Sequence, residues 1–359
     1  MTAADPHKPP ASPDPASTNS TSQGGDEAAT QQILAAGVQP GLRFAAVLDQ
    51  HGGCRDLDWA GVQAWRAETG FLWIHLEMDT PEASQWVRNS SGINPAMVDL
   101  LLAEDSRPRV EAVDDGLLLV LRGINLAASE VELVPIHVWI DERRAVTLRD
   151  RAHSLNALRD IRLDLVAGRG PCDAGSLLVP ICSKIVRDLE PILEQMDLEV
   201  TELEEQIIDA SPAKIRQKLA DLRRRAIHLR RYLVPQREAL FHLQTVASGL
   251  LSLGHRMSLS TVIDMIIRFI EDLDAIRERC TVVHEDLSAL INEQISKTSN
   301  RLTAVAALLL TPSLLVGMLG ANVGGIPFNN DPYGFQLITS FIVGIVIVQF
   351  VVFRRIRWL

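Results

Sequence analysis

Two long uncharged hydrophobic runs near the C-terminus constrain this chain more than any other feature. They cover Leu302–Leu319 and Phe335–Phe353, and no charged residue occurs between Leu302 and Asn330. About 20 apolar residues in a helix cross the hydrocarbon core of a bilayer, so the sequence predicts a transmembrane hairpin. Pro312 falls within the first run, which membrane helices tolerate when neighbouring groups satisfy the freed carbonyl. Two buried helices of a soluble protein would fit runs of this length poorly.

Basic residues predict the orientation of this hairpin. Lys297 and Arg301 precede the first run, Arg354, Arg355 and Arg357 follow the second, and the connecting loop contains no Lys or Arg. By the positive-inside rule, both termini are expected in the cytoplasm and the loop outside. Because no signal peptide opens the chain, the part before the hairpin is expected to stay in the cytosol.

Composition narrows the classes of function. The 359 residues include 35 Lys and Arg against 45 Asp and Glu, a formal net charge of -10, which disfavours nucleic-acid binding and suits a protein that handles cations. The 4 Cys residues are scattered without a CxxC pair, as expected for reduced cytosolic thiols. No P-loop, nucleophile elbow or HExxH motif is present, so an enzyme is not expected.

The part before the hairpin divides into three segments. Residues 1–40 are rich in Pro, Ser, Thr, Ala and Gly and are expected to form a disordered tail. Residues 41–170 predict a cytosolic α/β domain, a sandwich-like sheet flanked by helices, with a hairpin turn at Asp114-Asp115-Gly116. The expected strands are Phe44–Leu48, Phe71–Leu76, Leu117–Arg122, Pro135–Ile140 and Ala145–Leu148, and the expected helices are Pro81–Arg88, Pro95–Ala103 and Ser154–Val166.

Residues 171–300 predict a cytosolic stalk of long helices that leads into the transmembrane hairpin of residues 301–359. Ser176–Ile208 is acidic and Pro212–Val246 is basic, which favours an antiparallel pair with complementary charges over a nucleic-acid patch. Ser258–Leu319 has no Gly or Pro before Pro312 and would form one helix of about 90 Å, so the first span is expected to continue from the stalk.

The hairpin, the polar loop Gly320-Ala321-Asn322, the long helix and the basic end together resemble the CorA family of divalent-cation transporters. The family's Gly-Met-Asn motif is matched here with Ala321 in the middle. That departure, followed by Gly324-Gly325-Ile326-Pro327, resembles the zinc-transporter branch, ZntB. The resemblance implies a homopentameric funnel in the inner membrane of a bacterium, in which the Asn322 side chains ring the outer mouth.

The resemblance also implies the function. It points to the transport of divalent cations, most directly to zinc uptake. In the zinc branch this uptake is coupled to protons. No permanently bound cofactor is expected. A CorA-type Mg/Co/Ni conductor is the alternative within the family, and a membrane-anchored scaffold or sensor is the alternative from another class. Two spans cannot enclose a path, so a ring of identical subunits is required.

Helical spacing backwards from Asn322 selects one face of the first span as the candidate pore lining, with subunit packing as the alternative role. Leu302 and Leu310 would form hydrophobic constrictions and Ser313 a polar step. The face comprises Ser299, Leu302, Thr303, Ala306, Leu310, Ser313 and Gly317.

Further residues are candidates for attracting or holding cations. Glu278 and Glu285 extend the same face into the cytosol, where they either focus cations or are ordinary solvated charges. Asp331 is the only acidic residue of the outer loop and would attract cations to the mouth. Cys280 and His284, four residues apart on one helix face, provide only half of a zinc site.

Overall fold

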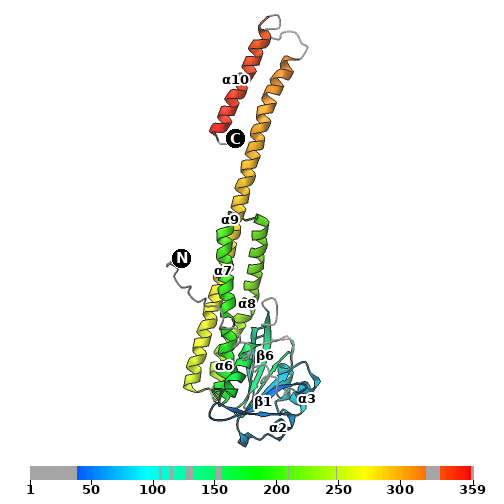
Figure 1. Cartoon of the computed structure of the whole chain (residues 1–359), viewed down its shortest axis with the longest axis vertical. Helices are drawn as coiled ribbons and strands as arrows, with labels where there is room; N and C mark the ends of the chain where they lie inside the picture. The colour runs from blue at the N-terminus through cyan, green and yellow to red at the C-terminus, as the bar shows by residue number, and fades with distance from the viewer. Residues whose placement is uncertain are drawn as a thin grey trace, which may run out of the picture. The chain divides into compact units, whose positions relative to one another are not determined.

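The computed structural model divides the chain into two compact units, Met1–Leu198 with Arg224–Ile276 and Glu199–Arg223 with Arg277–Leu359 (Figure 1). The first unit contains the sheet and the helical part of residues 224–276, and the second contains the helical residues from 277 into the hairpin, together with residues 199–223. The structure describes residues 39–104, 107–113, 116–125, 132–150, 155–208, 210–247, 249–320 and 332–356.

The first unit is built on a 7-stranded sheet with the order β2-β1-β3-β7-β6-β5-β4. Strands β3 and β7 are parallel, and every other neighbouring pair is antiparallel. The strands are β1 (Leu42–Leu48), β2 (Cys54–Leu57), β3 (Leu72–Glu77), β4 (Arg109–Val113), β5 (Gly116–Ile124), β6 (Leu133–Ile140) and β7 (Arg144–Arg149).

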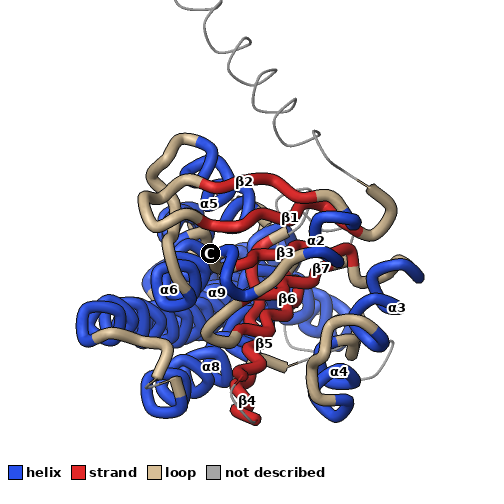
Figure 2. Tube along the Cα trace, turned by 90° about the horizontal axis from the view of Figure 1, so that it is seen from below, coloured by secondary structure: helices blue, strands red, loops and turns tan. Residues whose placement is uncertain are grey.

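Helices cover both faces of this sheet, which explains why β5 is buried along its whole length. On one face, α3 (Pro81–Asn89) and α4 (Pro95–Leu101) pack onto the core, and on the other lie α5 (Asn156–Val166) and α6 (Ala174–Arg187) (Figure 2). Gly123 lets the second layer approach closely, because a Cβ there would lie 2.8 Å from the side chain of Leu155. The predicted α/β/α sandwich is confirmed.

Local sequence signals start several of these helices. Pro81 and Pro95 occupy the first turns of α3 and α4, where the missing N–H costs no hydrogen bond. Asp173 and Ser176 form a capping box at the start of α6, each side chain accepting from the other residue's backbone N–H. A short helix, α2 (Trp59–Ala64), begins at the N-cap Asp58.

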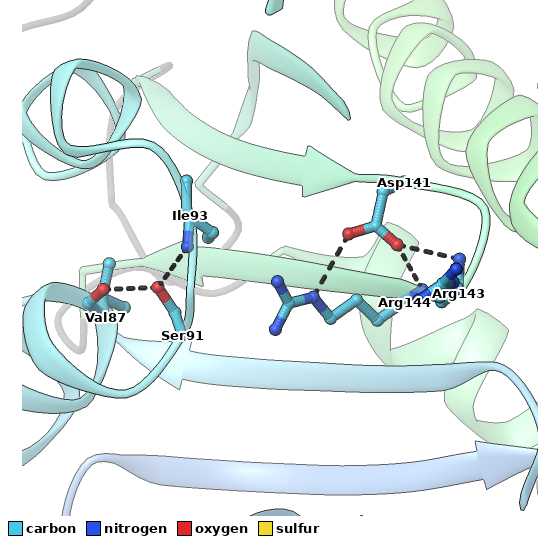
Figure 3. A network of polar contacts seen from close by, with 6 residues as sticks. All are labelled: Val87, Ser91, Ile93, Asp141, Arg143 and Arg144. Atoms are coloured by element: carbon cyan, nitrogen blue, oxygen red, sulfur yellow. Dashed lines mark hydrogen bonds and ion pairs between the residues drawn. The ribbon is translucent and has the colours of Figure 1, made fainter. Parts of the chain in front are cut away.

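Side-chain caps also fix two connections on one side of the sheet (Figure 3). The Asp141 carboxylate closes the turn between β6 and β7 by accepting from the backbone N–H groups of Arg143 at 2.8 Å and Arg144 at 2.9 Å. Between α3 and α4, the Ser91 hydroxyl donates to the Val87 carbonyl and accepts from the Ile93 N–H. Such local bonds satisfy backbone groups that no strand or helix pairs.

The predicted elements are found, with corrections. Strands β2 and β4 and helix α2 were not predicted. The predicted helix Ser176–Ile208 is two helices, α6 and α7 (Glu190–Gln206), with Leu189 fully buried where the chain passes from one to the other. The strands flanking the predicted turn pair antiparallel, Val113 opposite Gly116, although Asp114 and Asp115 lie outside the described residues.

Three long helices connect the sheet to the hairpin in sequence: α7, α8 (Pro212–Val246) and α9 (Leu253–Leu319). The 67 residues of α9 begin five positions earlier than predicted and include the whole first apolar run. The acidic and basic helices both form ion pairs with α9, which the prediction of a two-helix pair did not include. Within the second unit, Arg279 of α9 donates to Glu204 of α7 at 2.7 Å, and within the first, Arg230 of α8 pairs with Asp274 of α9 at 2.8 Å.

Candidate functional site

The end of α9 and the helix α10 (Gly334–Arg355) form the predicted hairpin within the second unit (Figure 1). Both are long and apolar enough to cross a membrane. In the 18-residue apolar segment of each helix, only 6% of the residues of α9 and none of those of α10 are buried by the rest of the chain. A core helix of a soluble protein would be mostly buried, so the low burial supports the membrane interpretation.

One face of α9 packs against α10. Ala304 is fully buried on this face, and Thr311 accepts a hydrogen bond from the side-chain amide of Gln349, with 2.7 Å between Thr311 Oγ1 and Gln349 Nε2. The Thr311 hydroxyl in turn donates to the Ala307 carbonyl at 3.0 Å. The contact stands beside Pro312, which has no N–H to give to the preceding turn. The hairpin therefore has one defined packing face on its first helix.

The seven candidate pore-lining residues lie on the opposite side of α9. Successive residues of a helix are turned by about 100°, so the middle of the face formed by these seven points about 130–150° away from Ala304 and Thr311. All seven are exposed, and Leu302 and Leu310 are among the most exposed residues of the span, at 68% and 70%. The face selected by helical spacing is thus the one that α10 leaves open, and it is available to line a path or to meet another subunit.

This open face belongs to a longer line of polar and small side chains, which we call the heptad stripe. Its members recur every seven residues of α9, all are exposed, and all belong to the second unit. No Lys or Arg occurs three or four residues before or after any of them. The heptad stripe consists of Glu278, Glu285, Asn292, Ser299, Ala306 and Ser313.

The chemistry of the heptad stripe suits hydrated cations. It presents carboxylate, amide and hydroxyl oxygens, which are the ligands that hard divalent cations prefer. Ser313 donates its hydroxyl proton to the Leu309 carbonyl at 2.7 Å, and the neighbouring Thr303 donates to Ser299 at 2.9 Å. Because these protons are engaged with the helix backbone, the hydroxyl lone pairs remain to accept from the water shell of an ion.

Of the predicted mouth, only Gly320 lies within the described residues. It follows α9 directly, and its N–H donates to the Val316 carbonyl at 2.8 Å. Ala321, Asn322 and Asp331 follow in a segment that the structure does not describe, so their roles stay predictions.

Among the residues that the structure describes, no additional ligand joins the half-site at Cys280 and His284. Cys280 is 2% exposed, whereas His284 is exposed. Among the described residues, no group of three His, Cys, Asp or Glu side chains is placed to hold a metal. A tetrahedral zinc site needs ligands beyond this pair.

Two residues of the site were missed in the sequence. Asn292 occupies the heptad stripe between Glu285 and Ser299, and the seven-residue interval identifies it without any structure. Gln349 was overlooked because a single polar residue within an apolar run does not reveal what it contacts. Its Oε1 is buried with no hydrogen-bond partner in the described part of the chain.

The α/β/α unit, the 67-residue helix and the apolar hairpin define a two-span membrane protein with a large N-terminal α/β unit. The chain belongs to the CorA family, because the family model described as CorA-like Mg2+ transporter protein matches residues 68–355. A curated relative agrees. The chain is 35% identical over 337 residues to the divalent cation transporter CmaX of Pseudomonas aeruginosa, covering 91% of this chain and 100% of CmaX.

Solved structures show the same fold. The full-length CmaX structure matches with a TM-score of 0.77 and 33% identity, over 90% of this chain and 100% of CmaX. The CorA magnesium transporter of Methanocaldococcus jannaschii matches with a TM-score of 0.76 and 21% identity, over 88% and 98%. The ZntB cytoplasmic domain of Vibrio parahaemolyticus matches with a TM-score of 0.61 and 19% identity, over 71% and 100%. At these identities the last two show the fold and do not assign this chain to the zinc branch.

Proposed function

We propose that this chain transports divalent metal cations across the membrane through a homopentameric pore lined by α9. The heptad stripe carries the proposal, since it is a regular line of exposed oxygen-bearing and small side chains with no Lys or Arg three or four residues away from any of them. Membership of the CorA family and the similarity to CmaX, a divalent cation transporter, support the same function.

The period of the heptad stripe supports the assembly of several copies. In a straight α-helix a seven-residue repeat drifts by about 20° per heptad, so the stripe faces one axis only if several copies of α9 supercoil around each other. One hairpin leaves this face exposed and cannot enclose a path. The number of five copies rests on the resemblance to the CorA family.

The orientation uses the basic residues at the ends of the spans. Lys297 precedes the first span, Arg354 and Arg355 end α10, and residues 320–333 contain no Lys or Arg. We therefore place both termini in the cytoplasm and the loop outside, in the plasma membrane of a bacterium.

The oxygen ligands of the heptad stripe favour a hard, strongly hydrated cation such as Mg²⁺ as the cargo. Zinc is the second candidate, and the loop at Ala321 and Gly324–Pro327 supports it through its resemblance to the ZntB branch. Neither span contains a titratable side chain between 302 and 319 or between 335 and 353, so a proton-coupled mechanism would have to use groups outside the spans.

Flux into liposomes that contain the purified protein tests the function. We expect uptake of Mg²⁺, Co²⁺ and Ni²⁺, inhibition of that uptake by Asn322→Ala, and little effect of the loop control Asn330→Ala. The zinc candidate would be favoured by Zn²⁺ uptake that Mg²⁺ does not inhibit and that depends on an imposed pH gradient. Absence of flux for every metal, in protein shown to be pentameric by native mass spectrometry, would leave the scaffold or sensor alternative.

A further inference from the structure

An aromatic groove lies on the first unit. Trp59 of α2 and Trp86 of α3 stand at its centre, with ring centroids 5.8 Å apart and planes inclined by 47°. Both indoles are half-buried, so each keeps part of its surface open to solvent. The groove has a volume of about 340 Å³ and is lined by Trp59, Gln63, Glu82, Gln85, Trp86, Asn89 and Ser90.

The polar groups around the two indoles are not used by the fold. Within the described residues, the side chains of Gln63, Glu82, Gln85 and Trp86 form no hydrogen bond or ion pair. The groove thus combines an aromatic surface with three amides, those of Gln63, Gln85 and Asn89, an indole N–H donor and one carboxylate. Aromatic surfaces with donors of this kind bind extended proline-rich segments, whose backbone carbonyls have no internal partners.

The described chain begins at the edge of this groove. The Trp59 backbone N–H donates to the Gln39 side chain, and its indole Nε1–H donates to the Pro40 carbonyl, both at 3.1 Å. Residues 1–38, which the structure does not describe, are therefore tethered beside the two tryptophans.

The tethered segment carries the matching sequence. Five of the ten residues from Pro6 to Pro15 are proline, and two PxxP repeats occur, Pro6-His7-Lys8-Pro9 and Pro10-Ala11-Ser12-Pro13. A polyproline II helix has three residues per turn, so the two prolines of each repeat lie on one side and can meet the aromatic surface together. Lys8 supplies a charge opposite to that of Glu82.

We propose that the groove between Trp59 and Trp86 binds residues 6–15 of the same chain in the polyproline II conformation. The separation between Pro15 and Gln39 is sufficient, since a random coil of 24 residues has a root-mean-square span of about 25–30 Å. A tether of this length gives an effective concentration of roughly millimolar, so a weak intrinsic affinity is sufficient.

Photocrosslinking in the full-length protein tests the proposal. The photoreactive residue p-benzoylphenylalanine replaces Gln85 in the groove, and in a matched control it replaces Glu111, which is exposed on the edge strand β4. After irradiation in detergent, peptide mapping is expected to locate the Gln85 crosslink in residues 6–15 and to find no such crosslink from position 111. Mixed light and heavy isotope-labelled chains distinguish a crosslink within one chain from one between copies.

Two sets of variants make the test specific. Replacing Pro9, Pro10 and Pro13 together with Ala, or Glu82→Lys alone, is expected to lower the crosslink yield at least threefold. Adding Lys8→Glu to Glu82→Lys is expected to restore it, because the charges are then exchanged. Circular dichroism verifies that each variant is folded. A crosslink from Gln85 to another part of the chain or to a second copy, or a yield that neither set of variants changes, overturns the proposal.

Discussion

The side-chain amide of Gln349 donates to the Thr311 hydroxyl between the two apolar helices, across 2.7 Å. This hydrogen bond joins α10 to the turn of α9 that contains Pro312, on the side opposite the heptad stripe. It fixes which face of α9 turns away from α10. The orientation of the candidate pore face therefore depends on a polar contact within the hydrophobic part of the hairpin.

We expect a measurable coupling between these two side chains. In a double-mutant cycle with Gln349→Leu and Thr311→Val, the interaction free energy should be about 0.6 kcal/mol and at most about 1.7 kcal/mol, the range found between membrane helices. Reversible unfolding of the full chain in mixed micelles measures it. Gln336→Leu combined with Thr311→Val is the control, since Gln336 is exposed on α10, and this cycle should give no coupling. Additive losses at 349 and 311 would show that the contact contributes nothing.

Leu310 is predicted to form a hydrophobic constriction. It is 70% exposed on the open face of α9, whereas Val305, 48% exposed, lies about a quarter turn or more from the heptad stripe. Replacing Leu310 with Ser should raise cation flux in liposomes several-fold. A ring of leucines excludes water from the path, whereas a ring of serines keeps it hydrated. Val305→Ser is the matched control and should leave flux near that of the unmodified protein. Equal effects of the two substitutions would contradict the assignment of this face.

Two buried histidines are expected to make the first unit sensitive to acid. Burial, reinforced by the positive charge of Arg149, holds the pKa of His75 well below its usual value, and burial also lowers the pKa of His137. The unfolded chain then binds protons that the folded chain does not, so stability is constant above the unfolded pKa of about 6.5 and falls as the pH drops below it. Each histidine contributes a slope of at most about 1.4 kcal/mol per pH unit.

Hydrogen exchange of the β3 amides between pH 5 and 8 measures this dependence. His75→Gln lowers stability at every pH, because it breaks the contact with Thr147 (2.9 Å from His75 Nδ1), but it should reduce the slope below pH 6.5. His51→Gln, at an exposed position, should keep the original slope. A slope that is unchanged in His75→Gln would mean that other groups set the acid sensitivity.

The sequence predicts the elements whose signal lies within one segment of the chain, such as a hydrophobic run or a proline that starts a helix. The buried strands β5 and β6 and the apolar spans are continuous hydrophobic runs, and α3 and α4 start at Pro81 and Pro95. Strands β2 and β4 were missed because they are edge strands with exposed polar residues, and only pairing with β1 and β5 makes them strands.

The candidate site, like the fold, could be predicted only where the signal lies within a single helix. Spacing along one helix selects a face of α9 that the structure shows to be exposed, because a face is a property of a single helix, and its role as a pore lining stays a prediction. The contact between Gln349 and Thr311 was not predictable, since it depends on how two helices meet in space. The mouth at Asn322 involves other copies of the chain and stays a prediction.

Asn292 provides a direct test of the heptad stripe, because it was identified only from its place between Glu285 and Ser299. Asn292→Lys puts a positive charge on the stripe of every subunit, and a ring of like charges repels cations along the path. We expect cation flux to fall at least tenfold. Gln294→Lys is the matched control, since Gln294 is also exposed but lies more than a quarter turn away around α9, and it should retain most of the flux. If both variants lose flux equally at high ionic strength, where surface charges are screened, then the heptad stripe does not line the path.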